Sequence, residues 1–514
     1  MPSTPGDVRC TERRQAETAG ARHNPPVHGR AALCLGLLLV GCAPTKSAPE
    51  RAAALSLTDC RLPGLYGPAR CGTWTVPENP DAPDGRTIDL NVVVRPARGT
   101  PVAPDPVFFL AGGPGQGATE VLPRVMFLGD ARENRDIVWV DMRGTGKSNK
   151  LACPPGDPKD LAARIELDAG LDEIEECLAG LDADTTQYTT PRLVADLEAV
   201  RAALGYESIN LYGGSYGTRL GLAYIAAHGD RVRSAVLDGN APYAMKLFVT
   251  FGEDGKPALD AMFAACAGEP ACNEAFPNLE ARFWAWLDGL APLEGEPSPM
   301  VTIRDPRTGF VGDVPLQRDA VASAIRGLLY GMETTALLPL AIDRAIAGDA
   351  SPLLSQAMIM GDGMEDSMAS GLMLSVACAE DVARTTEADM AALADEPFLG
   401  RSLVDMFSAA CGIWPTGEVP QSLFEPVRSD LPILLLSGDA DPVTPPRWAE
   451  EAKKTLPNAT HINVPATGHI AAGAECLGET IAEYYDEPTA AVTLDCPGGH
   501  ERPPFFIDFT GPTP

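Results

Sequence analysis

The sequence has few basic side chains for its length and none of the cysteine patterns that are typical of metal sites. It carries 40 lysines and arginines against 70 aspartates and glutamates, a formal net charge of −30 over 514 residues. This charge argues against nucleic acids and acidic membrane surfaces as partners, because both would repel the chain. It suits neutral or cationic ligands, and it suits equally well a solvated surface that binds nothing. No Cys-x-x-Cys pair or zinc-like Cys/His cluster occurs, so we predict no metal site.

The sequence also has no hydrophobic run at its N-terminus that is long enough for a membrane span. Basic residues precede an apolar run at residues 31–40, as in an export signal. The run ends in Leu39-Val40-Gly41-Cys42, which resembles the bacterial lipobox. That resemblance implies cleavage before Cys42, lipid attachment to its sulfur, and a membrane anchor facing the periplasm or cell surface. An ordinary secretory signal with a coincidental cysteine is the alternative.

Cysteine usage agrees with export into an oxidising compartment. Of 13 cysteines, Cys10, Cys34 and Cys42 lie in the leader or at its end, which leaves ten in the body of the protein. These ten form couples that are close in sequence, and we expect five disulfides, although spacing alone leaves the connectivity open. The couples are Cys60/Cys71, Cys153/Cys177, Cys266/Cys272, Cys378/Cys411 and Cys476/Cys496.

The length favours two domains, or one domain with a large insertion. Buried strands alternate with amphipathic helices on both sides of a central, mostly helical region, and this alternation predicts an α/β fold with a mostly parallel sheet. We expect a signal peptide at 1–41, a tether and extension at 42–70, the core at 71–240 and 429–514, and a helical cap at 241–428. The strands are expected at 73–76, 88–94, 107–110, 137–140, from 209, at 231–237, 432–437 and 460–464. The helices are expected up to 205, up to 227, and at 258–267, 279–290, 318–330, 335–347, 447–456 and 474–484.

A Gly-x-Ser-x-Gly turn directly follows the apolar strand that begins at Ile209. Such a turn holds its serine on a tight strand-to-helix elbow, with glycines where a Cβ would meet the neighbouring element. Ser215 would therefore project at the carboxyl end of a parallel strand, where α/β sheets place their ligands. We predict that Ser215 is a nucleophile.

A serine nucleophile needs a base, and the base needs an orienting acid. Of the histidines after the leader, only His469 follows a predicted strand at the carboxyl edge of the sheet. Asp441 follows the strand at 432–437 and is our choice for the acid, with Asp439 as the alternative. The order Ser215, Asp441, His469 is that of α/β-hydrolases, in which the three residues come from separate loops.

The oxyanion that forms during acyl transfer needs two hydrogen-bond donors. The amide of Tyr216 is one, and the glycine loop after the strand 107–110 offers the other from Gly113, with Gly112 as an alternative. Residues 113–118 also match a dinucleotide fingerprint, but two strands precede them, whereas that fingerprint opens the first βαβ unit. We therefore expect no cofactor.

Five motifs together resemble the proline iminopeptidase and tripeptidyl aminopeptidase group of α/β-hydrolases. They are Gly112–Gly115, Asp141-x-Arg143-Gly144-x-Gly146-x-Ser148, Gly213–Gly217, Asp441–Pro445 and Gly468-His469. The resemblance extends from about Cys71 to Cys496 and is closest to the secreted tripeptidyl-aminopeptidase-like branch. One departure is Ala111, where proline iminopeptidases usually carry histidine, and it puts a narrow proline specificity in doubt.

The resemblance implies an exopeptidase that acts on peptides with a free amino terminus. It also implies acidic cap residues that hold the substrate ammonium group, for which Glu380 is our choice and Asp381 the alternative. An esterase or lipase using the same triad is the first competing hypothesis, because fold and triad do not fix the acyl group. A lipoprotein that only binds peptides is the second.

Overall fold

The computed structural model describes residues 54–165, 170–290, 297–474, 476–494 and 501–512. Residues Ala52–Pro514 form one compact unit by their internal contacts. The expected signal peptide and Cys42 lie outside the described residues. In the described ranges, no helix combines the length and the apolar character that a membrane crossing requires.

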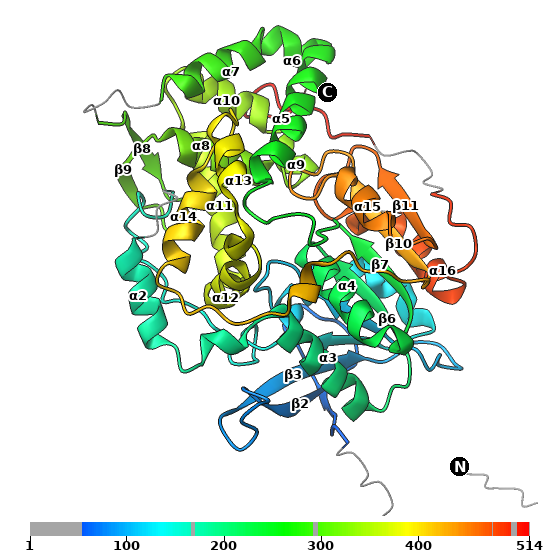
Figure 1. Cartoon of the computed structure of the whole chain (residues 1–514). Helices are drawn as coiled ribbons and strands as arrows, with labels where there is room; N and C mark the ends of the chain where they lie inside the picture. The colour runs from blue at the N-terminus through cyan, green and yellow to red at the C-terminus, as the bar shows by residue number, and fades with distance from the viewer. Residues whose placement is uncertain (1–53, 166–169, 291–296, 475, 495–500, 513–514) are drawn as a thin grey trace, which may run out of the picture. The chain divides into compact units, whose positions relative to one another are not determined.

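A nine-stranded sheet forms the centre of the structure (Figure 1), in the order β1-β2-β3-β5-β4-β6-β7-β10-β11. The first three strands pair antiparallel, β3 meets β5 antiparallel, and all strands from β5 to β11 run parallel. This is the mostly parallel sheet that the sequence predicts. The strands are β1 (Thr58–Cys60), β2 (Ala69–Pro77), β3 (Thr87–Arg95), β4 (Val107–Leu110), β5 (Ile137–Val140), β6 (Ile209–Gly214), β7 (Val232–Asp238), β10 (Ile433–Gly438) and β11 (Ala459–Val464).

Helices cover both faces of this sheet, because successive side chains of a strand point to opposite sides. Phe108 packs in the core under α3 (Thr190–Leu204), α4 (Tyr216–His228) and α15 (Pro446–Lys453). Its neighbour Phe109 packs in the opposite core, which α16 (Leu477–Asp486), α1 (Ala118–Val121) and the short 3₁₀ helices over 122–133 close. Both faces are buried, which accounts for the continuous apolar strands of the sequence.

The chain between β7 and β10 builds a cap with its own hydrophobic core. The expectation of a mostly helical insertion is confirmed, but the sequence analysis missed a β-hairpin of β8 (Met300–Arg304) and β9 (Val311–Pro315). The helix expected over 335–347 corresponds to α10, and the short helix α9 before it was not expected. The cap helices are α5 (Phe251–Gly268), α6 (Pro270–Ala275), α7 (Leu279–Asp288), α8 (Arg318–Leu328), α9 (Met332–Thr335), α10 (Leu338–Ile346), α11 (Ser351–Ser367), α12 (Ser370–Glu380), α13 (Glu387–Ala394) and α14 (Ser402–Cys411), and α2 (Leu171–Gly180) lies before β6.

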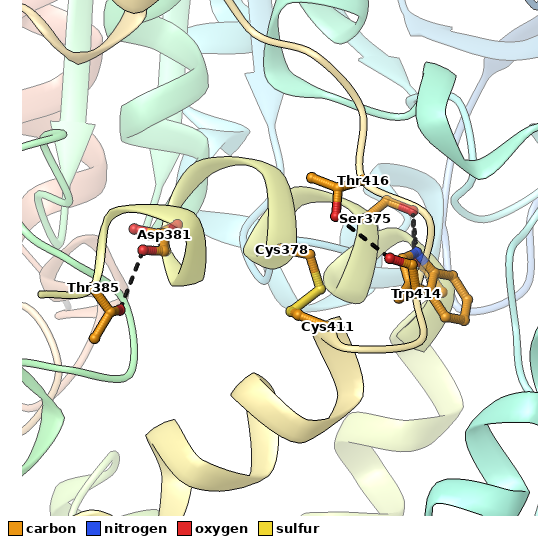
Figure 2. The surroundings of a disulfide bond; sticks show 8 residues. Ser375, Cys378, Asp381, Thr385, Cys411, Trp414 and Thr416 are labelled. Carbon is orange, nitrogen blue, oxygen red and sulfur yellow. Dashed lines mark hydrogen bonds between the residues drawn. A yellow bond between two sulfur atoms is a disulfide. The ribbon is translucent and has the colours of Figure 1, made fainter. Parts of the chain in front are cut away.

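Disulfides join four of the five expected couples, namely Cys60–Cys71, Cys153–Cys177, Cys266–Cys272 and Cys378–Cys411. Cys476 is also disulfide-bonded, and its expected partner Cys496 lies outside the described residues. The Cys378–Cys411 bond ties α12 to the end of α14 (Figure 2), where the Trp414 indole donates a hydrogen bond to Ser375 at 3.0 Å. Such cross-links fit an oxidising compartment, where disulfides form and persist.

Candidate active site

Ser215 lies between β6 and α4 in a backbone conformation that few non-glycine residues adopt, with φ 56° and ψ −125°. The two flanking glycines allow this tight elbow. A Cβ on Gly213 would lie 2.4 Å from the Gly217 carbonyl oxygen, and one on Gly217 would lie 2.2 Å from the Leu110 carbonyl oxygen. The Gly-x-Ser-x-Gly pattern is thus imposed by packing, and the strained serine is the expected feature of a nucleophile elbow.

Asp441 and His469 meet at the carboxyl ends of the neighbouring strands. Asp441 Oδ2 lies 2.9 Å from His469 Nδ1, and both side chains are buried. The other carboxylate oxygen accepts hydrogen bonds from the amides of Val443 and Thr444 at 2.8 and 2.9 Å. Burial alone would raise the pKa of Asp441, but His469 and the hydrogen bonds from Thr444 hold it below its ordinary value. The carboxylate is therefore ionised and fixes the imidazole with Nδ1 toward it.

The alternative acid, Asp439, has a different setting. Its side chain is exposed and accepts a hydrogen bond from the Thr467 amide at 3.4 Å. It therefore stabilises the turn rather than the imidazole. Among the other histidines, His461 lies on β11 and contacts Glu450 at 2.6 Å, and His228 ends α4.

The loop that carries His469 reaches the elbow that carries Ser215. A Cβ on Gly214 would lie 3.4 Å from Ile470 Cδ1, so the residues next to Ser215 and His469 are in contact range. A Cβ on Gly239, which follows β7, would lie 3.2 Å from His469 Cε1. Between these two described residues, no direct hydrogen bond joins the Ser215 hydroxyl to the imidazole. Catalytic hydrogen bonds of this kind often tighten only when substrate is bound.

Asp238 connects these two loops, and sequence analysis missed it. This fully buried residue at the end of β7 accepts the Ser215 amide on its backbone carbonyl at 2.8 Å. Its carboxylate accepts the amides of Ala471 and Ala472 at 2.9 and 2.8 Å and the Tyr212 hydroxyl at 2.9 Å. Burial raises the pKa of Asp238, against the lowering effect of the two amides. The only available sign in the sequence was a carboxylate at the end of the strand beside the serine.

The glycine loop expected to supply Gly113 lies against the serine and under the cap. A Cβ on Gly112 would lie 3.1 Å from Ser215 Cβ, so the loop is adjacent to the nucleophile. On its other side, a Cβ on Gly113 would lie 3.0 Å from the sulfur of Met368, and the Ala369 amide donates to the Gly115 carbonyl at 2.9 Å. Met368, which follows α11, therefore lies over this loop.

Glu380 is fully buried, and its oxygens are engaged by protein groups. Oε1 accepts the Thr190 amide at 2.7 Å, and Oε2 accepts the hydroxyls of Thr190 and Tyr243, each at 2.8 Å. Burial raises the pKa of Glu380, and Thr190 and Arg219 counter it. Because Thr190 is the first residue of α3, Glu380 caps that helix and joins it to α12. These contacts give Glu380 a structural task and leave it no exposed oxygen for a substrate ammonium.

The side chain of Tyr216 belongs to the same network. Its hydroxyl lies 2.6 Å from Thr190 Oγ1. The alternative, Asp381, forms a buried ion pair with Arg219 at 2.8 Å. The amide of Tyr216 begins α4 and is one of the helix donors without an intrahelical partner. Within the described part of the chain, no group of three or more histidine, cysteine or acidic side chains is arranged to hold a metal ion.

Comparisons with known proteins agree with this architecture. Residues 105–261 match the family described as alpha/beta hydrolase fold, and residues 396–495 match TAP-like protein. The chain is 26% identical over 503 residues to the serine protease Hip1 of Mycobacterium tuberculosis, which covers 88% of this chain and 93% of the relative. It is 30% identical over 204 residues to a tripeptidyl aminopeptidase of Streptomyces coelicolor, covering 36% of this chain and 38% of the relative. It is 35% identical over 134 residues to a proline iminopeptidase of Neisseria gonorrhoeae, covering 26% and 32%.

The sheet order, the serine elbow and these matches define an α/β-hydrolase. Within that fold the chain is similar to these peptidases and to the TAP-like proteins. It is a serine hydrolase.

Proposed function

We propose that this enzyme is a serine exopeptidase that releases residues or short peptides from free amino termini. The carrying observation is the Asp441–His469 hydrogen bond on the loop that contacts the Ser215 elbow. The peptide substrate class is supported by the relatives, all three of which are named as peptidases.

In the proposed mechanism, His469 removes the hydroxyl proton of Ser215 as the oxygen attacks the scissile carbonyl. Asp441 keeps the imidazole in the correct tautomer and stabilises its charged form. The amides of Tyr216 and Gly113 hold the oxyanion, and each such donor contributes about 10²–10³ in rate. The imidazolium then protonates the leaving amine, and water hydrolyses the acyl-enzyme by the same steps in reverse.

The preference for a free amino terminus requires a group that recognises the substrate ammonium. The contacts of Glu380 argue against the assignment that the family resemblance implies. The overall charge of −30 favours a cationic terminus at long range.

One set of assays tests the proposal. Purified enzyme receives a peptide amide with a free amine, its N-acetylated form and a short-chain ester, and each reaction is repeated with Ser215→Ala. The exposed serine variant Ser422→Ala is a matched control. Cleavage restricted to the free amine, lost in Ser215→Ala and kept in Ser422→Ala, is the expected result. Equal rates on the acetylated peptide contradict an exopeptidase, and turnover of the ester alone supports an esterase.

For location, we propose an exported lipoprotein that Cys42 anchors to a membrane. The disulfides support an oxidising compartment. A Cys42→Ser variant is expected to lose metabolic labelling with a fatty acid and to leave the membrane fraction. Retention of both would contradict lipid attachment at this residue.

A further inference from the structure

Arg326 on α8 is a buried cation without a counter-charge. The residue is 7% exposed, and its Cζ lies 3.9 Å from the ring centroid of Phe251 and 5.5 Å from that of Tyr330. Among the described residues, Nε and Nη2 have no hydrogen-bond partner, and no carboxylate forms an ion pair with the guanidinium. Ring faces attract a cation, but they do not satisfy its directional N–H donors.

Other buried arginines differ from Arg326 in having hydrogen-bond acceptors. Arg143 pairs with Asp196 at 2.7 Å, and Arg219 pairs with Asp381 at 2.8 Å. Within the described ranges, Arg95 and Arg132 also lack a carboxylate partner, but each donates to a backbone carbonyl. A buried charge that lacks such a partner costs several kcal/mol, so it is retained where a partner arrives from outside the chain or where function requires it.

Acidic side chains on the elements near Arg326 are committed elsewhere. Asp254 lies on α5, the helix that also carries Phe251, and it pairs with Arg447 at 2.6 Å. Glu396 accepts three backbone amides, those of residues 398–400, at 2.7–2.9 Å. Neither carboxylate is available to neutralise Arg326.

Arg326 is also close to the active site through Tyr330. The Tyr330 carbonyl accepts the His469 amide at 2.9 Å, and the tyrosine ring lies edge-on to the imidazole with centroids 5.2 Å apart. The Arg326 Cζ lies 5.5 Å from the Tyr330 ring centroid, and the imidazole centroid lies 5.2 Å from the same point. The distance between the guanidinium and the imidazole therefore cannot exceed the sum of these two distances. An extended peptide advances roughly 3.3–3.6 Å per residue, so this separation spans at most about three residues of substrate.

We propose that Arg326 binds a carboxylate on the leaving side of the substrate. This inference rests on the proposed function, in which His469 protonates the leaving amine and the leaving segment therefore lies on the imidazole side. A guanidinium binds a carboxylate with two parallel hydrogen bonds, and Nε and Nη2 form one such edge. The carboxylate comes from the C-terminus of a short peptide or from an acidic side chain within two or three residues of the scissile bond.

Three substrates with the same free amino terminus distinguish these sources. The first carries glutamine near its end and has a free C-terminal carboxylate. The second has the same sequence with a C-terminal amide. The third also ends in an amide but has glutamate in place of the glutamine. For the enzyme, we expect kcat/KM to be about tenfold to a hundredfold higher with a carboxylate than without one, as for charge-assisted hydrogen bonds. A preference for the first or for the third substrate identifies the source, and either supports the proposal.

The variant Arg326→Met is expected to bring this ratio to about one, and Arg326→Lys to an intermediate value because a lysine lacks the fork. Each ratio comes from one preparation, so a misfolded fraction cancels. Arg318→Met, at the start of the same helix, is the matched control and keeps the ratio of the unmodified enzyme. A ratio near one in the unmodified enzyme, or an unchanged ratio in Arg326→Met, overturns the proposal.

Failure of the proposed function is recognised separately. If the enzyme cleaves none of the peptides, the same carboxylate and amide peptides are titrated into Ser215→Ala protein by calorimetry. Tighter binding of the carboxylate forms that disappears in the double variant Ser215→Ala/Arg326→Met supports the anion site without any turnover. Equal affinities there reject it.

Discussion

Replacement of Asp238 by asparagine tests whether one buried carboxylate sets the relation between the nucleophile and the base. The carboxylate holds the two amides that follow His469 by two and three residues, and the backbone of the same residue holds the Ser215 amide. Ile470 lies between His469 and the first of these two amides, and it has φ 74°. A β-branched residue adopts this left-handed value only under restraint. The carboxylate is therefore expected to supply that restraint.

The magnitude follows from the hydrogen bonds. The Ala471 amide donates to one carboxylate oxygen, and the Ala472 amide donates to the other. An asparagine has only one oxygen, so in either orientation its NH₂ group faces one of these two amides, and two donors then meet. One buried amide then lacks an acceptor, and the remaining bond loses its charge assistance, which together cost about 3 kcal/mol of the free energy of unfolding. We also expect kcat to fall about 10²-fold, as for a displacement of about 1 Å between reacting groups.

The assay combines urea unfolding with kcat on a peptide that the enzyme cleaves. Tyr212→Phe is the matched control, since it removes the third hydrogen bond to Asp238 and leaves both loop amides bound. This control is expected to cost about 1 kcal/mol of stability with little change in kcat. If Asp238→Asn loses stability but keeps its kcat, other contacts hold His469 in place and the reasoning is refuted.

Three further predictions concern other carboxylates. Asp441→Asn is expected to lower kcat about 10⁴-fold with KM little changed, because the imidazole then takes the wrong tautomer; a loss below tenfold would remove Asp441 from the triad. Glu380→Gln is expected to lower the free energy of unfolding by about 1–2 kcal/mol with KM unchanged, since it weakens the cap on Thr190; a raised KM at full stability would instead support a substrate contact. Burial raises the pKa of Asp254 from 3.8 to about 6 despite Arg447, so the folded state keeps a proton that the unfolded chain loses. Stability should then fall by up to about 3 kcal/mol as the pH rises from about 4 to 6, and urea unfolding across that range should show no such fall in Asp254→Asn.

The features that sequence patterns predicted are those that depend on local geometry. The elbow at Ser215 needs glycines at fixed spacing, because a Cβ at either flank would meet backbone atoms of the elbow itself or of β4. The strand at β10 and the turn after it place Asp441 in a similar local way, and Gly205 ends α3 with φ 80° as its position predicts. Alternating buried strands and amphipathic helices were sufficient to predict the parallel sheet.

The features that were missed depend on contacts between distant segments. Asp238 bonds to amides more than 200 residues away, and Glu380 bonds to Thr190, 190 residues away. The sequence contains 70 acidic residues, and no local pattern separates the few that are buried from those on the surface. The family resemblance proposed Glu380 as a contact of the substrate ammonium, whereas its hydrogen bonds to Thr190 and Tyr243 give it a structural role. Arg326 gave no signal at all, because only burial without a partner makes it exceptional.

The network around α12 also limits how the cap can move to admit a substrate. Asp381 on this helix is paired with Arg219 on α4, the helix that begins at the nucleophile elbow, and both side chains are fully buried. Separating the two would leave a charge without a partner in the interior, at a cost of roughly 3–5 kcal/mol. Glu380 adds two hydrogen bonds to Thr190 across the same boundary, and the Cys378–Cys411 bond fixes the helix to α14 (Figure 2). Helix α12 is therefore fixed to the helices α3 and α4 of the core. Substrate entry has to depend on other cap segments, which are bound to the core less tightly than α12 is.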